Sequence, residues 1–388
     1  MKKGFSKRFM YVFVMSIMLT AFLTGCSSND KNESEKTATE TVAPAADNNT
    51  ADNGGNDVLT TDNQIEQFET ASPVPEGMVK STLTGKYVDE KIAKKRPYAV
   101  MINNIEYAAG FHSGLSKASI IYEAKVEGGI TRLMALFEDV SKLKKIGPIR
   151  SARHYFVSVA SEYDAIFVHF GHTKFALKKI DKLGVDNLSG LSGYGGMVFY
   201  RDKNIKAPHN AFTSKKGLEA GLKRLKYRKN HKKDYQGHFR FYDQDTDLAE
   251  GKDANKVSIK FSGYANPYFK YNAEKKLYYR YQYGKKNMDT ANNKQLSFKN
   301  IIIQFVDDEP IVKGHPKDYR TINFEKASGK GRYITNGKSI KIRWEKNEKT
   351  GYMKYFNEDG SALVINPGKT YVALYPDEGS ALKISAGI

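Results

Sequence analysis

Two neighbouring runs of the sequence decide the fold, Lys145-Ile146-Gly147-Pro148-Ile149-Arg150-Ser151-Ala152-Arg153-His154 and Tyr163-Asp164-Ala165-Ile166-Phe167-Val168-His169-Phe170-Gly171-His172-Thr173. They predict a loop, a helix, a buried strand and a loop into a second helix. Ser151 is expected to cap the first helix, because its side-chain oxygen can accept a hydrogen bond from a free backbone N–H. One apolar face of that helix is predicted by the spacing of Ala152, Tyr155, Phe156, Val159, Ala160 and Tyr163.

The residues around these runs predict an α/β domain over residues 81–235. Strands are expected at 96–104, 123–127, 131–137 and 165–170, with a short helix over 115–122. Thr173 is expected to cap a helix that Gly184 ends, and a further helix is expected from Ser214 to Lys226. Alternation of strands and helices favours a central sheet flanked by helices.

From Val257 onward apolar residues recur with period two, which predicts a mainly β domain over residues 250–388, a barrel or a sandwich. The strongest local signal is Asn336-Gly337-Lys338 between two strand-like runs, a pattern typical of a tight hairpin.

The first 25 residues predict a lipoprotein signal peptide. Four basic residues precede an apolar run over 9–23, and Leu23-Thr24-Gly25-Cys26 has the lipobox pattern. Cys26 is then the lipidation site, and palmitate-type acyl chains would anchor the mature protein in the lipid bilayer. A single transmembrane anchor is the alternative, but the apolar run is short for a span of about 20 residues. Cys26 is the only cysteine, so no disulfide framework is expected.

Charge is unevenly distributed along the chain. Residues 26–80 hold eleven acids and three bases and few large apolar residues, which predicts a flexible acidic tether. The whole chain carries +19, so the part from residue 81 onward is strongly basic. A basic body at the outer face of the cytoplasmic membrane would face an anionic wall polymer, lipid head groups or envelope proteins. Export argues against nucleic acid as a partner.

The candidate ligand site lies at the turns of the two runs 145–154 and 163–173. Arg150 and Arg153 suit phosphate or carboxylate groups, and ligands in α/β sheets bind beyond the carboxyl ends of strands. In the alternative interpretation either arginine pairs with Glu123 or Glu127 and stabilises the fold. The basic run from Lys215 to Lys233 is either a solvated helix face or a polyanion contact. The full set of expected ligand residues is Arg150, Ser151, Arg153, His169, His172, His209 and Asn210.

Whether the protein is an enzyme stays open at this stage. An envelope hydrolase would use His154 or His169 as its base with Glu127 as partner. Ser151 lacks the glycine-flanked elbow of a nucleophilic serine. No metal is expected, because His169 and His172 are not a helical pair and no cysteine ligand is present, and no cofactor is expected. A binding or scaffold role is therefore the leading hypothesis, a hydrolase is the alternative, and a purely structural role for these residues is the third.

Several long motifs occur one after another along the chain. They are Arg96-Pro97-x-Ala99-Val100-Met101-Ile102-x-Asn104, Tyr122-Glu123-x-x-Val126-Glu127-Gly128-Gly129-x-Thr131-Arg132, Gly147-Pro148-Ile149-Arg150-Ser151-Ala152-Arg153, Pro208-His209-Asn210, Gly337 to Trp344 and Asn366-Pro367-Gly368-Lys369-Thr370. With these motifs the chain resembles the YerB-like lipoproteins of Gram-positive bacteria over about residues 85 to 376. The resemblance implies two domains, both of unknown function, and supplies no activity.

Overall fold

The computed structural model describes residues 74–315, 317–323, 327–347, 351–376 and 381–387. The predicted signal peptide, Cys26 and most of the acidic tether lie outside these residues. Within them, no helix is long and apolar enough to cross a membrane.

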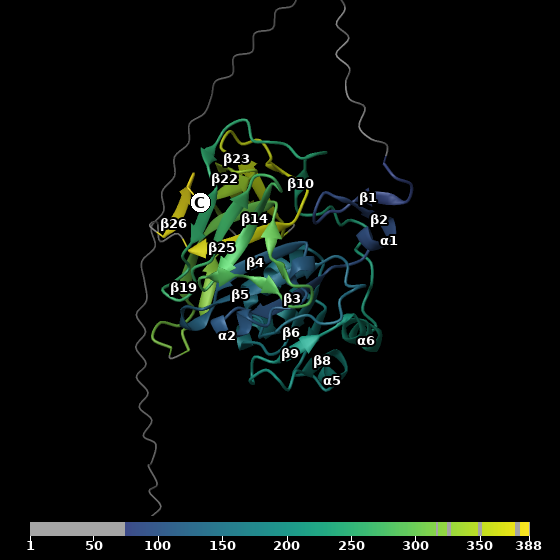
Figure 1. Ribbon diagram of the computed structural model, residues 1–388. Coiled ribbons are helices and arrows are strands. Elements are labelled where there is room, and N and C mark those ends of the chain that lie inside the picture. Colours follow the sequence, from purple (N-terminus) through teal and green to yellow (C-terminus); the bar gives the residue numbers. More distant parts are fainter. Residues whose placement is uncertain (1–73, 316, 324–326, 348–350, 377–380, 388) are drawn as a thin grey trace, which may run out of the picture. The chain divides into compact units, whose positions relative to one another are not determined.

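One twelve-stranded mixed sheet runs through the described part of the chain (Figure 1). In spatial order its strands are β11 (Lys252–Asp253), β22 (Lys338–Lys346), β21 (Ser328–Thr335), β19 (Asn300–Pro310), β25 (Thr370–Pro376), β4 (Ile120–Lys125), β5 (Thr131–Phe137), β3 (Tyr98–Asn103), β6 (Ile166–His169) and β7 (Asn187–Ser189), with β20 (Arg320–Asn323) on β19 and β23 (Met353–Asn357) on β22.

The two halves of the chain meet inside this sheet. Strand β25 pairs in parallel with β4, with Tyr371 opposite Ile121. The α/β part supplies β3 to β7, and the β-rich part supplies β11, β19 to β23 and β25. The expected architecture, an α/β part followed by a mainly β part, is confirmed, and the backbone hydrogen bonds of one sheet connect the two parts.

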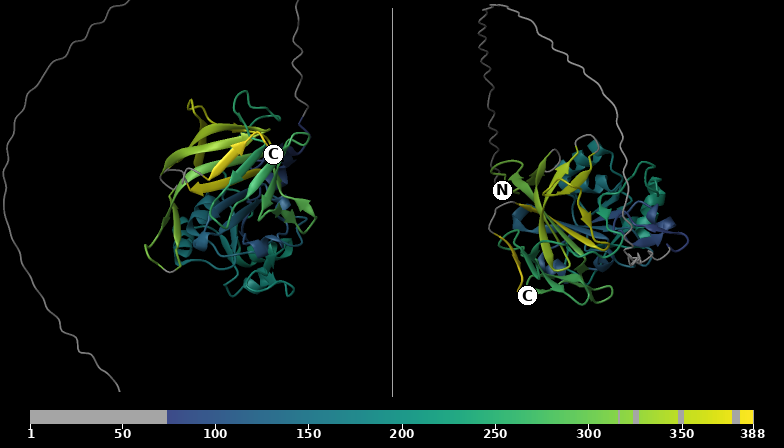
Figure 2. Two further views of the ribbon diagram at one scale, coloured as in Figure 1. Left: turned by 60° about the vertical axis from the view of Figure 1, so that its left-hand side comes forward. Right: turned by 90° about the horizontal axis from the view of Figure 1, so that it is seen from above.

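A second, six-stranded sheet packs on one face of the large sheet, as in a sandwich (Figure 2). Phe269 and Phe298 from this sheet meet Tyr371 of the large sheet at ring-centroid distances of 4.8 and 5.6 Å. Its strands are β15 (Lys285–Lys286), β14 (Leu277–Gln282), β13 (Tyr268–Asn272), β12 (Lys256–Ile259), β26 (Leu382–Ser385) and β18 (Ser297–Phe298).

Helices cover the α/β half of the large sheet on both faces. Helices α3 (His154–Glu162) and α4 (Lys174–Leu183) bury their apolar sides against one face. Helices α5 (Gly195–Val198) and α6 (Lys215–Leu225) pack on the other. The remaining short elements are α1 (Glu90–Ala93), α2 (Glu106–Ala109), the 3₁₀ turns Leu115–Lys117 and Glu127–Gly129, and the strand pairs β1 (Met78–Lys80) with β2 (Tyr87–Asp89), β8 (Phe199–Arg201) with β9 (Ala211–Thr213), β10 (Arg240–Phe241) with β24 (Val364–Ile365) and β16 (Met288–Asp289) with β17 (Lys294–Gln295).

Two local predictions are wrong. Helix α3 begins at His154 with Arg153 as its N-cap residue, and Ser151 does not cap it. Residues around Ala152 are extended because they pair with the segment that follows β6: the Ala152 N–H donates to Gly171 O at 2.9 Å. The helix expected over 115–122 shrinks to one 3₁₀ turn, since residues from Ile120 onward are needed as the central strand β4.

Candidate functional site

The loop from Ile146 to Arg153 forms the floor of the site. It runs beside the carboxyl end of β3, where Asn103 N–H donates to Pro148 O at 2.8 Å and Arg150 N–H donates to Met101 O at 3.0 Å. Gly147 has φ +144°, and a Cβ there would lie 2.9 Å from the Phe212 ring. Only glycine fits this close approach, so the sequence fixes where the loop enters the site.

Arg153 forms an ion pair that ties the loop to the turn after β4. Its guanidinium makes two hydrogen bonds to the Glu127 carboxylate, and both side chains are largely buried. Its Nη1 also donates to Ala152 O at 2.8 Å. For this arginine, the structure shows the internal ion pair that the sequence left open as the alternative interpretation.

Arg132, at the start of β5, is a buried cation without a carboxylate partner among the described residues. It is 5 % exposed, and its Nη1 donates to the Ser151 carbonyl at 2.6 Å. The pKa of Arg132 is lowered to about 9, chiefly by burial; repulsion from Arg153 and Arg150 also lowers it, while Glu127 and Tyr155 raise it. A buried charge in this setting is costly unless another group compensates it.

Arg150 and Arg201 add two more positive charges. Arg150 makes a long contact with Pro208 O at 3.4 Å and has no acidic partner in the part of the chain that the structure describes. Burial, Arg153 and Arg201 all lower the pKa of Arg150. The Arg201 guanidinium lies over the Phe170 ring at 4.7 Å and donates to Asn210 Oδ1 at 2.8 Å.

We call Arg132, Arg150, Arg153 and Arg201 the arginine cluster. Glu127 is the one carboxylate that the described structure pairs directly with it. Guanidinium groups are planar donors that suit phosphate and carboxylate oxygens. The cluster therefore has the charge and the donors for an anion.

The predicted histidines divide between two environments. His169 is buried at the end of β6, where Nδ1 bonds with Gly171 O at 2.7 Å and Nε2 with Asn187 Oδ1 at 3.1 Å. Burial lowers its pKa, so its role in the described structure is to hold the turn. His172 is half-buried, 6.0 Å from His169 between ring centroids.

His209 and Asn210 lie on the Arg150 side of the site. His209 Nδ1 accepts from Asn103 Nδ2 at 2.8 Å, and burial followed by repulsion from Arg150 and Lys206 lowers the pKa of His209. Asn210 accepts from Arg201 and donates from Nδ2 to Asp202 O at 3.1 Å. These two residues position the rim of the cluster.

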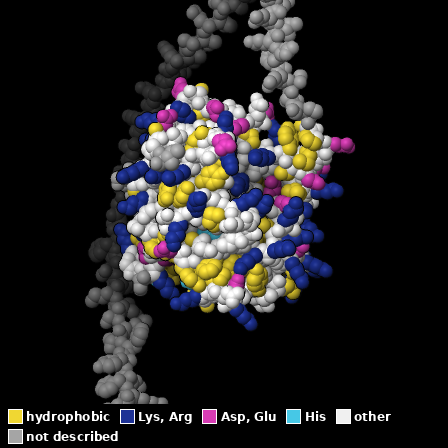
Figure 3. Space-filling model, in the orientation of Figure 1, with side chains coloured by type: hydrophobic (Ala, Val, Ile, Leu, Met, Phe, Trp, Pro, Cys, Tyr) yellow, Lys and Arg dark blue, Asp and Glu magenta, His cyan; other side chains and the backbone are white. Residues whose placement is uncertain are grey.

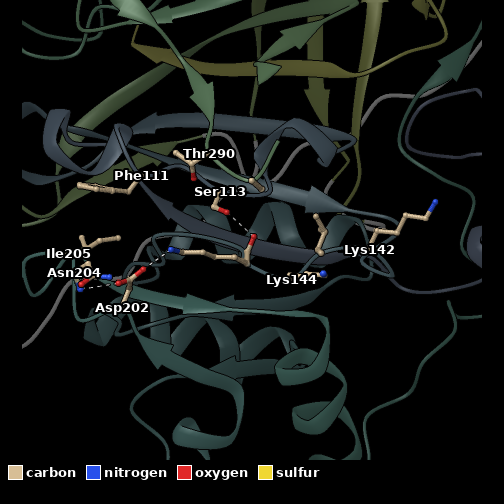
Figure 4. A pocket seen from close by; sticks show the side chains of 11 residues that line it. Phe111, Ser113, Lys142, Lys144, Asp202, Asn204, Ile205 and Thr290 are labelled. Atoms are coloured by element: carbon tan, nitrogen blue, oxygen red, sulfur yellow. Dashed lines mark hydrogen bonds and ion pairs between the residues drawn. The ribbon is translucent and has the colours of Figure 1, made fainter. Parts of the chain in front are cut away.

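Two cavities flank the loop. One of about 480 Å³ brings together Ser151, Arg153, His172, Glu127 and Thr173, four of which the sequence had singled out for this site. Another of about 660 Å³ lies beyond the loop that carries His209 (Figure 4). Its lining is Phe111, Ser113, Lys142, Leu143, Lys144, Lys145, Asp202, Asn204, Ile205, Thr290 and Ala291.

The described contacts show neither of the predicted acid–base pairs, His154 with Glu127 or His169 with Glu127. His154 Nε2 bonds with Thr321 Oγ1 at 3.0 Å, and Glu127 is engaged by Arg153. Among the described residues no group of three His, Cys, Asp or Glu side chains is arranged to hold a metal ion. Candidate acids and bases for a hydrolase are thus each bonded elsewhere.

Sequence reasoning missed Arg132, Arg201 and Asn103 as members of the site. Arg132 stands in a conspicuous Thr131-Arg132 pair, but only the sheet shows that the start of β5 lies next to the end of β3. The basic run from Lys215 to Lys233 includes helix α6, and Figure 3 shows Lys and Arg side chains over much of the visible face, with acidic side chains among them.

The chain belongs to a family that has an N-terminal and a C-terminal domain, each described by its own family model. Residues 83–228 match the family model described as "Protein of unknown function (DUF3048) N-terminal domain", and residues 257–372 match the corresponding C-terminal domain model.

Among its relatives is the Bacillus subtilis (strain 168) protein named "Putative lipoprotein YerB". It is 32 % identical over 329 residues, which is 83 % of this chain and 93 % of that protein. The crystal structure of YerB from Bacillus subtilis matches with a TM-score of 0.69 and 30 % identity, covering 79 % of this chain and 99 % of that one.

Proposed function

We propose that this protein is a lipid-anchored receptor or scaffold at the outer face of the cytoplasmic membrane, and that its arginine cluster binds an anionic group of an envelope ligand. The observation that carries the proposal is Arg132, a cation 5 % exposed that has like charges beside it and no paired carboxylate among the described residues. The lipobox at Cys26 and the name of the relative, a putative lipoprotein, support the location.

A bound anion would remove the electrostatic conflict in the cluster. Arg150 and Arg153 both lower the pKa of Arg132, so an oxyanion shared between these side chains would favour all three charges. Charge-assisted hydrogen bonds of this kind contribute about 1.5–3 kcal/mol each. Glu127 holds Arg153 in place, which leaves Arg132 and Arg150 to provide the new contacts.

The contacts of the histidines support binding over hydrolysis. A general base must reach the proton it takes within about 3 Å, with a partner that orients it. His169 bonds with a backbone carbonyl and an amide, and Glu127 bonds with Arg153. A binding role needs neither group to change its partner.

The test is calorimetric titration and thermal unfolding of the full chain in detergent, with inorganic phosphate and citrate as probes. Arg150→Gln removes one donor, and Arg224→Gln, an exposed position on α6, is the charge-matched control. We expect the wild type and the control to bind and to melt at higher temperature with ligand, since ligands of the native state stabilise it by mass action. Arg150→Gln should lose at least about tenfold in affinity.

Either of two outcomes would overturn the proposal. Absence of binding by the wild type to both probes would remove the anion site. Equal losses in Arg150→Gln and Arg224→Gln would show that net charge, or the basic run on α6, attracts the probes, and the arginine cluster would then be structural.

A further inference from the structure

The larger cavity has a lining unlike that of the arginine cluster. Its walls come from four segments: the turn after α2, the loop after β5, the loop after β8 and the turn between β16 and β17. Figure 4 shows Phe111 opposite Asn204 and Ile205 at one end, with Lys142 and Lys144 toward the other. At about 660 Å³ it falls in the size range of small-molecule sites.

The accessible lining combines apolar surface with polar and charged groups. Leu143 and Ile205 are 7 % and 5 % exposed, so their surfaces belong mainly to the core. What remains is one partly exposed aromatic ring, Phe111, among hydroxyl, amide, carboxylate and ammonium groups. Lys145 pairs with Asp202 at 2.6 Å, whereas Lys142 and Lys144 have no acidic partner among the described residues.

A chain of rings connects this cavity with the arginine cluster. The Tyr107 ring lies 5.1 Å from Phe111 and 5.8 Å from His209 between centroids. Tyr107 is 42 % exposed, and its hydroxyl accepts from the Lys206 N–H at 2.9 Å. His209 in turn bonds with Asn103 beside Arg150. A ligand can therefore cover the cavity, the tyrosine and the cluster in sequence.

We propose that the cavity is a saccharide subsite and that the ligand of the arginine cluster is an anionic glycan. This inference rests on the proposed function and narrows it. Sugar rings offer an apolar face of C–H groups, which packs on aromatic rings such as Phe111 and Tyr107. Their hydroxyl groups match planar amide and carboxylate side chains such as Asn204 and Asp202.

The charges also fit a polymer that carries repeated negative groups. Lys142 and Lys144 lie toward one end of the cavity (Figure 4), and the contacts through Tyr107 and His209 lead on to Arg150. A lipid acyl chain would need a continuous apolar wall, whereas ammonium, hydroxyl, amide and carboxylate groups interrupt the wall of this cavity.

The test compares three ligands on the full chain in detergent: trigalacturonate, citrate with a similar charge but no sugar rings, and maltotriose with rings but no charge. We expect trigalacturonate to bind at least tenfold more tightly than citrate, and maltotriose to bind most weakly. Asn204→Ala, at an exposed position, and Phe111→Leu should each lower trigalacturonate affinity several-fold and leave citrate affinity unchanged.

Failures of the two proposals are distinguishable. Citrate binding without any advantage for trigalacturonate, or unchanged trigalacturonate affinity in both cavity variants, would overturn the saccharide subsite and leave the anion site standing. Absence of binding to both anions would overturn both. Equal affinity for maltotriose and trigalacturonate, or tighter binding to phosphatidylglycerol vesicles than to trigalacturonate, would also overturn the inference, in the last case in favour of lipid head groups.

Discussion

Replacing Arg280 is expected to destabilise the whole folded part of the protein, because this arginine holds the two halves together. Arg280, on β14, donates from Nη2 to Glu123 on β4 at 2.7 Å, and both side chains are 0 % exposed. Burial disfavours the arginine charge, yet Glu123 raises the pKa of Arg280. Tyr371, on β25, donates to the same carboxylate oxygen at 2.7 Å.

The magnitude follows from what Arg280→Gln leaves behind. Glu123 would keep its hydrogen bonds from Asn104, Thr131 and Tyr371, but its buried negative charge would have no cation. Breaking a buried pair on one side costs about 3–5 kcal/mol. For a folded part of roughly 300 residues that free energy corresponds to a fall in melting temperature of about 5–8 °C.

A double-mutant cycle separates the pair from its surroundings. Glu123→Gln should also be costly, since it orphans the arginine, and the double variant Glu123→Gln, Arg280→Gln should cost less than the sum of the two. Lys338→Gln is the matched control, because Lys338 pairs with Asp253 at 2.8 Å while half-exposed and should change stability by less than about 1 kcal/mol. Thermal scans and guanidinium unfolding measure each variant.

The reasoning would be refuted by a loss in Arg280→Gln no larger than that in Lys338→Gln, or by additive single losses. Two separate unfolding transitions in the wild type would refute it as well. The two halves share β25 and β4 in one sheet, and the Glu123–Arg280 pair crosses between them, so one cooperative transition is expected.

Three further predictions concern other parts of the fold. His112 is buried with Nε2 against Asn103 O, and burial lowers its pKa to about 4, so the unfolded state takes up the proton first as the pH falls. The free energy of unfolding should therefore fall by on the order of 3 kcal/mol as the pH drops from 6.5 toward 4, and urea midpoints of His112→Gln should depend less on pH. The pKa of Asp164 is raised by burial but lowered more by its hydrogen bonds, so its contribution to stability is present at neutral pH and lost below about pH 4. Asp164→Asn, which tolerates φ +48°, should remove that pH dependence with less loss of stability than Asp164→Ala, as thermal scans at pH 3 and 7 would show. In Gly217→Ala the new Cβ would lie 2.3 Å from a backbone oxygen, so about 1–3 kcal/mol should be lost, whereas Gly193→Ala, with open space, should be near neutral in guanidinium unfolding.

Local features of the fold were predictable because their causes are local. Thr173 accepts from Ala176 N at 3.1 Å and Gly184 ends α4 in the left-handed conformation, as expected. Asn336 and Gly337 have φ of +47° and +79°, the turn that their residue types favour between β21 and β22.

Features that depend on distant partners were not predictable. Residues 115–122 carry apolar spacing that suits a helix, but those from Ile120 onward pair with β5 on one side and β25 on the other as a strand. No residue near Ile120 in the sequence indicates that Ile120 pairs with Thr370 in the sheet. The Ser151 cap fails for the same reason, since pairing of Ala152 with His172 holds the chain extended up to Arg153.

Arg150 and Arg153 show how this long-range pairing also arranges the side chains of the candidate site. In sequence both arginines precede the same helix and had the same two interpretations, an internal ion pair or an anion ligand. In an extended chain, side chains three positions apart point to opposite sides. Arg153 therefore meets Glu127 and is neutralised, while Arg150 reaches Pro208 O beside His209 and keeps its charge available. The ion-pair interpretation therefore holds for Arg153, the anion-ligand interpretation of Arg150 remains our proposal, and the extended backbone separates the two side chains.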